Sequence, residues 1–287
     1  MGSTEPSAGE LPTRIKAIEN DSGAETVAVA YYDYQTKTGW DYNGDEWFHA
    51  ASTIKVPVLV GVFGAIEAGT ITENSRVHVR NRFLSAADGE PYRIESGRDA
   101  NSAVHSARGK TMKVGDLAYH MITTSSNLAT NLLIDLVGLE RMKDTLAELG
   151  ADGIQLARGV EDERAFEEGI SNRVTAKGLL HVLRLVEEGQ AFPEPLSKRM
   201  LEILHGQEFR GGIPAGLPDD ARVAHKTGEI STVAHDAGLV YLPDREPYGV
   251  AILTRWAADG PSGRSATIAR LSRAVFEHLT CAEGDDE

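Results

Sequence analysis

Cysteine is almost absent from this chain of 287 residues. Its single cysteine, Cys281, excludes an internal disulfide, a CxxC zinc site and a cysteine-ligated iron–sulfur cluster. Its place near the C-terminus also argues against a catalytic thiol. The nine histidines are scattered singly, without H-E-x-x-H or H-x-H spacing. The chain also has neither a phosphate-binding loop nor a G-x-G-x-x-G pattern, so we predict neither a metal site nor a cofactor.

Basic residues are also scarce. The chain carries 29 Lys and Arg against 43 Asp and Glu, so its formal net charge is −14. Binding to a nucleic-acid backbone or to an anionic membrane surface depends on basic side chains. We therefore expect neither nucleic acid nor a membrane as a partner. The composition, 41% hydrophobic and 25% charged, is that of a globular protein and argues against disorder.

Long apolar runs are missing as well. The longest extends from Val56 to Ile66, well short of the roughly 18–20 residues that span a bilayer. The segment from Met1 to Glu10 has neither the basic nor the apolar region of a secretory signal. We therefore expect a cytoplasmic protein, or an exported one whose signal was removed from the recorded sequence.

Local patterns predict helix and strand at both ends of the chain and helix in the middle. A helix is expected at 11–20 and a strand at 26–34, followed by a turn and a second strand that starts at Trp40. From Ser52 to His205 the apolar residues recur with helical spacing. The last part predicts three strands and a final amphipathic helix; the strands are expected at 221–225, 237–242 and 248–254.

These elements predict an α/β (α+β) fold in a single domain, 1–287. Its antiparallel sheet would combine N- and C-terminal segments and be covered by the terminal helices, beside an inserted all-helical subdomain. The expected parts are a sheet subdomain, a helical subdomain and an acidic tail, at 11–51 with 212–281, at 52–211 and at 282–287. We expect a monomer that binds a small molecule in the cleft between the subdomains.

A serine and a lysine lie three residues apart in Ser52-Thr53-Ile54-Lys55, ahead of an apolar segment expected to be helical. Residues three apart share a helix face, so the Lys55 amine can reach Ser52. A serine hydroxyl becomes a good nucleophile when a base takes its proton, and a lysine can do so when burial or nearby cations lower its pKa. The alternative is that Ser52 caps the helix and Lys55 is solvated.

Two further motifs carry polar groups toward the expected cleft. Ser125-Ser126-Asn127 lies between two helical segments, where its side chains either face the cleft or cap the second helix. Lys226-Thr227-Gly228 follows the strand expected at 221–225 and places a cation and a hydroxyl beside the same cleft. The same tripeptide occurs as Lys37-Thr38-Gly39 in a predicted hairpin turn, where glycine suits the backbone. The tripeptide alone therefore proves little.

The three motifs together are more specific than any one of them. They occur in the order S-x-x-K, S-x-N, K-T-G, each in the local structure that its role requires. In this the chain resembles the penicillin-recognising serine enzymes, and the class A β-lactamases most closely. The resemblance covers nearly the whole chain and is most specific at 50–60, 111–133 and 224–228. It implies a β-lactamase/transpeptidase-like fold.

The resemblance implies that the first two motifs carry out acylation. Ser52 would be the acylated nucleophile, and Lys55 would be its base or proton relay. Ser125 would pass a proton to the departing ring nitrogen.

The remaining motif residues would bind the substrate. Asn127 would hold the substrate's side-chain amide, Lys226 would supply electrostatic stabilisation, and Thr227 would bind the substrate carboxylate. The oxyanion hole would consist of the backbone N–H of Ser52 and that of Glu229, the residue after Gly228.

The sequence departs from the family in the loop that carries the deacylating glutamate, because the family's E-x-x-L-N pattern is absent. Placing Arg158 on the family's loop arginine puts Glu163 at the catalytic position. Glu161 and Glu167 are alternative candidates. A further alternative is that all three carboxylates are solvated loop charges.

A second departure is Ser126, which stands where the family usually has an aspartate that braces the motif. The sequence therefore predicts that this motif is held in place differently. It does not rank the candidates for an additional carboxylate-binding cation, which are Arg222, Arg255 and Arg264.

These observations predict a serine hydrolase that opens the β-lactam ring through an acyl-enzyme on Ser52. One alternative is a penicillin-binding peptidase or esterase that deacylates β-lactams slowly, because the loop pattern is missing. An alternative from another class is a non-catalytic homologue that binds a ligand in the same cleft.

Overall fold

The computed structural model describes residues 10–99 and 102–281, so the acidic tail predicted at 282–287 lies outside the described residues. Its largest sheet is five-stranded and antiparallel, in the order β10-β11-β12-β1-β2. The strands are β1 (Thr26–Asp33), β2 (Thr38–Tyr42), β10 (Arg222–Ile230), β11 (Val233–Tyr241) and β12 (Tyr248–Arg255).

Strands from the two ends of the chain are adjacent in this sheet. β1 pairs with β12 so that Ala30 lies opposite Ala251. The predicted sheet from N- and C-terminal segments is therefore confirmed. β10 is longer than the strand expected at 221–225, and it carries Lys226, Thr227 and Gly228 within the sheet rather than after it.

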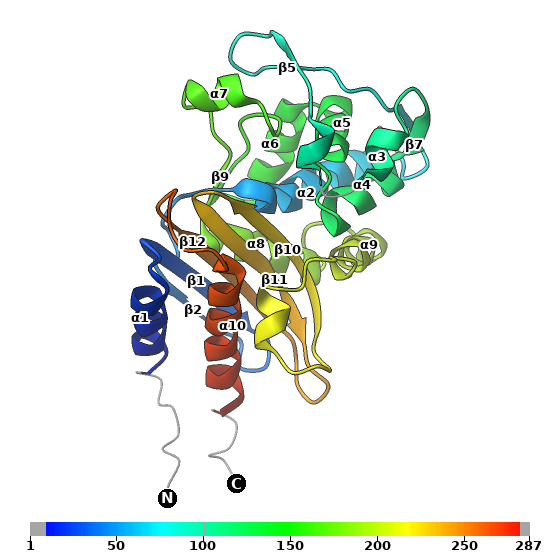
Figure 1. The fold of residues 1–287 in the computed structure, drawn as a ribbon. Helices are drawn as coiled ribbons and strands as arrows, with labels where there is room; N and C mark the ends of the chain where they lie inside the picture. Colours follow the sequence, from blue (N-terminus) through cyan, green and yellow to red (C-terminus); the bar gives the residue numbers. More distant parts are fainter. Residues whose placement is uncertain (1–9, 100–101, 282–287) are drawn as a thin grey trace, which may run out of the picture.

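The terminal helices α1 (Glu10–Ser22) and α10 (Arg264–Cys281) lie side by side on one face of the sheet (Figure 1). Their side chains, including Ile15 and Leu271, form one buried cluster with Val29 and Ile252 of the sheet. Alternate residues of a strand point to opposite faces, and those on the other face join a second cluster with the helical part. The sheet is therefore buried on both faces except at the edge strand β2, whose residues are exposed or half-buried.

The helical part consists mainly of α2 (Lys55–Glu67), α4 (Val114–Thr123), α5 (Asn127–Val137), α6 (Leu139–Glu148), α8 (Ala176–Glu187) and α9 (Glu194–His205). α8 packs on the sheet, while α2 contacts α4, α5 and α6. α2 is apolar on all sides, as expected of a buried helix. A Cβ at Gly61 would lie 2.5 Å from Met142 Cγ, so glycine lets α6 approach closely. Within the part of the chain that the structure describes, no helix is both long and apolar enough to cross a membrane.

The middle of the chain is not wholly helical, contrary to the expectation for 52–211. It contains the short helices α3 (Ala103–Ser106) and α7 (Glu163–Glu167) and several short strands. The strand pairs are β4 (Arg76–His78) with β7 (Thr111–Lys113), β5 (Phe83–Leu84) with β6 (Pro91–Tyr92), and β9 (Arg173–Val174) with both β3 (Phe48–His49) and β8 (Ile154–Gln155). Strands of two or three residues are too short for an alternating pattern to reveal them.

Candidate active site

A cleft of about 1030 Å³ is lined by residues of both the helical part and the sheet. It brings together residues of all three motifs, namely Ser52, Ser125, Asn127, Thr227 and Gly228, and also Glu229, the residue after the third motif. The two motif lysines, Lys55 and Lys226, lie beneath this lining because their side chains are fully buried. The structure therefore assembles at one place every motif residue to which the resemblance assigns a role.

Ser52 and Lys55 meet at a junction between two kinds of helix. Ser52 lies in the 3-10 helix η1 (Ala51–Ile54), and Lys55 is the first residue of α2. Lys55 Nζ lies 3.0 Å from Ser52 Oγ, 3.0 Å from Ser125 Oγ and 2.7 Å from Asn127 Oδ1. In its neutral form, an amine at this distance can accept the proton of the Ser52 hydroxyl.

The electrostatic surroundings of Lys55 favour that neutral form. Burial lowers the pKa of Lys55 to about 7, an effect that the carboxylates of Asp99 and Glu161 partly oppose. The pKa of Lys226 is also lowered, first by burial and then by the charge of Lys55, while Asp236 opposes the shift. Lys226 Nζ donates to the backbone carbonyl of Thr227 at 2.8 Å. Two buried amines thus share one site.

Three non-glycine residues that line the cleft have backbone conformations of positive φ. They are Ala51 at 44°, Ser125 at 57° and Glu161 at 58°. Such conformations are uncommon for residues with a Cβ and are retained at functional sites when the surrounding structure enforces them. Each of these residues belongs to, or directly precedes, a segment that presents a polar group to the cleft.

The loop carboxylates differ in position. Glu161 accepts a hydrogen bond from Asn127 Nδ2 at 3.1 Å and pairs with Arg98 Nε at 2.8 Å. Its side chain is 18% exposed, and burial raises its pKa. Glu163, at the start of α7, is 68% exposed and pairs with Arg98 Nη1 at 2.5 Å. The structure therefore brings Glu161, rather than the expected Glu163, to the group around Lys55.

A family comparison agrees with this geometry. Residues 10–279 match the sequence model described as "Beta-lactamase enzyme family". The chain belongs to this family. It is 26% identical to a beta-lactamase of Bacteroides uniformis, over 94% of this chain and 91% of that protein. The resemblance inferred from the three motifs is thereby confirmed.

Solved structures of the family share the fold. PBP-A superimposes with a TM-score of 0.81 at 25% identity, covering 98% of this chain and 99% of that one. A beta-lactamase from Sphaerobacter thermophilus gives a TM-score of 0.80 at 28% identity, covering 96% and 98%. The chain is therefore a serine hydrolase of the class A beta-lactamase type, and it binds a small-molecule substrate.

The sequence did not predict Asn131, which supports the loop that carries Glu161. Asn131 Nδ2 donates to the backbone carbonyl of Val160 at 2.9 Å, and the backbone N–H of Val160 donates to Asn131 Oδ1 at 2.8 Å. These two hydrogen bonds attach Val160, the residue before Glu161, to α5. Asn131 follows Asn127 by four residues, and this spacing on one helix face is the signal that could have identified it.

The three candidate arginines for binding the substrate carboxylate lie outside the lining of the cleft. Arg255 pairs with Glu46 at 3.0 Å, Arg264 donates to the backbone carbonyl of Ile230 at 3.0 Å, and Arg222 stacks on Tyr241. None of these three arginines lines the cleft, whereas the exposed Arg210 does.

Within residues 10–99 and 102–281, no group of three or more His, Cys, Asp or Glu side chains is arranged to hold a metal ion.

Gly228 allows the sheet to contact the nucleophile's backbone. A Cβ at this position would lie 2.9 Å from the backbone nitrogen of Ser52 and 2.8 Å from that of Thr53. Contacts this short with backbone atoms force a shift, because the backbone cannot rotate away as a flexible side chain can. A glycine is therefore needed for β10 and η1 to lie together at the predicted oxyanion hole.

We expect Gly228→Ala to lower kcat/KM for a chromogenic cephalosporin by about 10–100-fold, because the added methyl group displaces the Ser52 amide from the oxyanion. Gly97→Ala serves as the control, since a Cβ at Gly97 meets open space. If Gly228→Ala keeps the kcat/KM of the unmodified protein, then close contact between β10 and η1 is not required for activity.

Proposed function

We propose that this protein hydrolyses β-lactams through an acyl-enzyme on Ser52. The observation that carries the proposal is the buried amine of Lys55, which lies 3.0 Å from Ser52 Oγ and has a pKa lowered to about 7. A base with a pKa near neutrality is suited to activate a hydroxyl under physiological conditions.

Acylation follows from the contacts of Lys55. Its neutral amine accepts the Ser52 proton, Ser52 Oγ bonds to the lactam carbonyl carbon, and the carbon–nitrogen bond of the ring breaks. Ser125 Oγ, also 3.0 Å from Lys55 Nζ, passes a proton to the departing nitrogen. The proton can then be replaced from Lys55, so that charge and atoms balance. The backbone N–H groups of Ser52 and Glu229 stabilise the oxyanion.

Substrate binding uses further side chains in and beneath the cleft. Thr227 and Arg210 both line the cleft and bind the substrate carboxylate. The buried amine of Lys226 assists them, and Asn127 holds the substrate's side-chain amide. Because a single chain supplies all of these groups, we propose that the protein acts as a monomer.

Deacylation uses Glu161. Its carboxylate is held between Asn127 and Arg98, beside the group around Lys55. A raised pKa makes a carboxylate a stronger base, so Glu161 can take a proton from a water that attacks the acyl-enzyme. That attack releases the ring-opened product and restores Ser52. The exposed side chain of Glu163 is less suited to hold a water in place.

The related PBP-A supports the chemical class. A mutant of that protein, 24% identical to this chain, was solved as an acyl-enzyme complex with penicillin G. The same fold therefore accommodates a covalent penicillin adduct in that protein.

We expect the protein to turn over a chromogenic cephalosporin, and Ser52→Ala to abolish both turnover and the covalent adduct seen by intact-mass analysis with penicillin. Ser231→Ala, at another serine that lines the cleft, should keep both. A persistent adduct without turnover would instead indicate a slowly deacylating penicillin-binding peptidase or esterase. Absence of both adduct and turnover in the unmodified protein would contradict the catalytic function.

Replacing the deacylating carboxylate should separate the two half-reactions. We expect Glu161→Gln to slow deacylation by about 10²–10⁴-fold, because its amide cannot take a proton from water. Stopped-flow measurement with intact-mass analysis should then show an accumulated acyl-enzyme. Glu163→Gln, and the control Glu168→Gln on the same loop, should deacylate at rates within about threefold of the unmodified protein. Accumulation in Glu163→Gln alone would restore the assignment expected from the sequence.

Acylation should depend on pH through Lys55. Below its pKa of about 7 the amine is protonated and cannot accept the Ser52 proton, so the acylation rate should fall as the pH drops from 8 to 5. The groups facing Lys55 are Asp99, Glu161 and Lys226. Since Glu161 raises the pKa of Lys55, single-turnover acylation of Glu161→Gln should show its acid limb at lower pH. An unchanged acid limb in that variant would argue against Lys55 as the titrating base.

A further inference from the structure

The Ser125-Ser126-Asn127 motif lies at the first turn of α5, where backbone N–H groups have no partner inside the helix. In this structure each of the four N–H groups from Ser126 to Ala129 has a hydrogen-bond partner. Ser126 N–H donates to the carbonyl of His120 at 3.1 Å, and Ala129 N–H donates to Ser126 Oγ at 3.2 Å. The N–H groups of Asn127 and Leu128 both donate to the carboxylate of Asp99.

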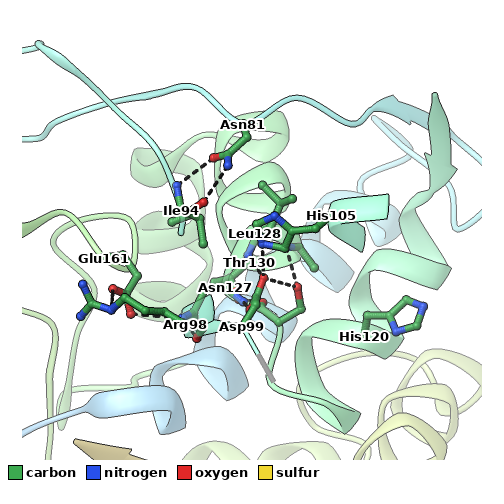
Figure 2. A network of polar contacts seen from close by, with 12 residues as sticks. Asn81, Ile94, Arg98, Asp99, His105, His120, Asn127, Leu128, Thr130 and Glu161 are labelled. Atoms are coloured by element: carbon green, nitrogen blue, oxygen red, sulfur yellow. Dashed lines mark hydrogen bonds and ion pairs between the residues drawn. The ribbon is translucent and has the colours of Figure 1, made fainter. Parts of the chain in front are cut away.

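Asp99 comes from a distant segment, just after the 3-10 helix η2 (Ser96–Arg98) (Figure 2). Besides the two backbone N–H groups, its Oδ2 accepts from Ser126 Oγ at 3.2 Å. Asp99 thus contacts the second and third residues of the motif and the residue after them. Its side chain is 0% exposed and lies outside the lining of the cleft.

His105 also contacts the carboxylate of Asp99. His105 Nε2 lies 2.9 Å from Asp99 Oδ2, and the imidazole is 5% exposed. Because both Asp99 oxygens already accept backbone N–H groups, the imidazole nitrogen is the donor in this contact. An imidazole so placed fixes the orientation of the carboxylate, as it would in any buried carboxylate–histidine pair.

The segment before Asp99 is also held by hydrogen bonds to other parts of the chain. Asn81 Nδ2 donates to the carbonyl of Ile94 at 2.7 Å, and Ile94 N–H donates to Asn81 Oδ1 at 2.8 Å (Figure 2). Arg98, next to Asp99, accepts a hydrogen bond from Asn127 Nδ2 on its carbonyl at 3.4 Å. The segment that carries Asp99 is therefore itself held by hydrogen bonds at two residues, Ile94 and Arg98.

We propose that Asp99, backed by His105, is a positioning residue that holds Ser125 and Asn127 against Lys55. It supplies from a distant segment the buried carboxylate that position 126 lacks. The inference rests on the proposed function for its kinetic consequence, whereas its structural part depends on the hydrogen bonds alone. Asp99 acts through the motif and touches no substrate, since it is buried behind Asn127.

Removing the carboxylate should lower activity more than stability. We expect Asp99→Ala to reduce kcat for a chromogenic cephalosporin by about 10–100-fold with KM changed less than about threefold, because small displacements of reacting groups are costly. The melting temperature should fall by roughly 2–4 °C, as for loss of a helix cap. Asp116→Ala, at an exposed aspartate in the first turn of the neighbouring helix α4, should leave kcat unchanged.

A second substitution distinguishes positioning from a merely structural role. Ser126→Asp in the unmodified protein should lower kcat, because it sets a second carboxylate against Asp99. In the Asp99→Ala background the same Ser126→Asp change should raise kcat at least about tenfold, since it returns a carboxylate to the motif. This reversal of sign is the expected result. If Ser126→Asp has the same effect in both backgrounds, then Asp99 does not hold the Ser125-Ser126-Asn127 motif in position.

Amide hydrogen exchange tests the structural part without any substrate. The amides of Asn127 and Leu128 should exchange at least about tenfold faster in Asp99→Ala, while those of the distant helix α8 keep their rates. His105→Ala should show a smaller increase, and His105→Gln, which keeps an N–H donor, should restore protection. Unchanged exchange at Asn127 and Leu128 would overturn the proposal even if β-lactam hydrolysis is demonstrated. If exchange becomes faster in Asp99→Ala but the unmodified protein fails to acylate, the positioning role of Asp99 is supported and the proposed function is contradicted.

Discussion

A buried amine must have its hydrogen bonds and its charge satisfied by its neighbours, and this constraint on Lys55 organises the whole site. Taking a charged amine out of water costs several kcal/mol even after a protein relaxes around it. The structure meets part of this cost with acceptors from Ser52, Ser125 and Asn127. It avoids the rest by lowering the pKa, so that the neutral form needed for catalysis becomes accessible. The net charge of −14 describes the surface, while the site concentrates two buried amines.

The contacts of Lys55 require segments that are far apart in the chain to meet within hydrogen-bond distance. Its partners Ser125, just before α5, and Asn127, at the start of that helix, lie 70 and 72 residues further along the sequence. Gly228 brings the sheet against the same turn, because any larger residue would overlap the Ser52 amide. The positive φ values of Ala51 and Ser125 are consistent with this demand, since strained backbone persists where tertiary contacts enforce it. The cleft is thus the place where the sheet and the helical part hold each other.

Two carboxylates near Lys55 have different tasks because they have different surroundings. Glu161 borders the cleft and contacts Asn127 and Arg98, so it can reach a water and the substrate. The side chain of Asp99 is fully buried, and both of its oxygens accept backbone N–H groups, so it can only orient other groups. Both raise the pKa of Lys55 against the effect of burial. Arg98 is adjacent to Asp99 and pairs with Glu161, so it links the segment that carries Asp99 to the loop that carries Glu161.

The amino-acid sequence by itself determined the features that depend on local spacing. Ser52 and Lys55 are recognisable because residues three apart share a helix face, and the alternating and helical patterns at both chain ends predicted the sheet and its covering helices. The short strands of the middle escaped prediction because two or three residues show no period. Only the tertiary structure decided which loop carboxylate meets Asn127, that Arg210 lines the cleft, and that Asp99 braces α5. Glu161 lies 34 residues from Asn127 in sequence, and Asp99 lies 28 residues away. No local rule relates residues so far apart, because their meeting depends on how the intervening loops fold against the core.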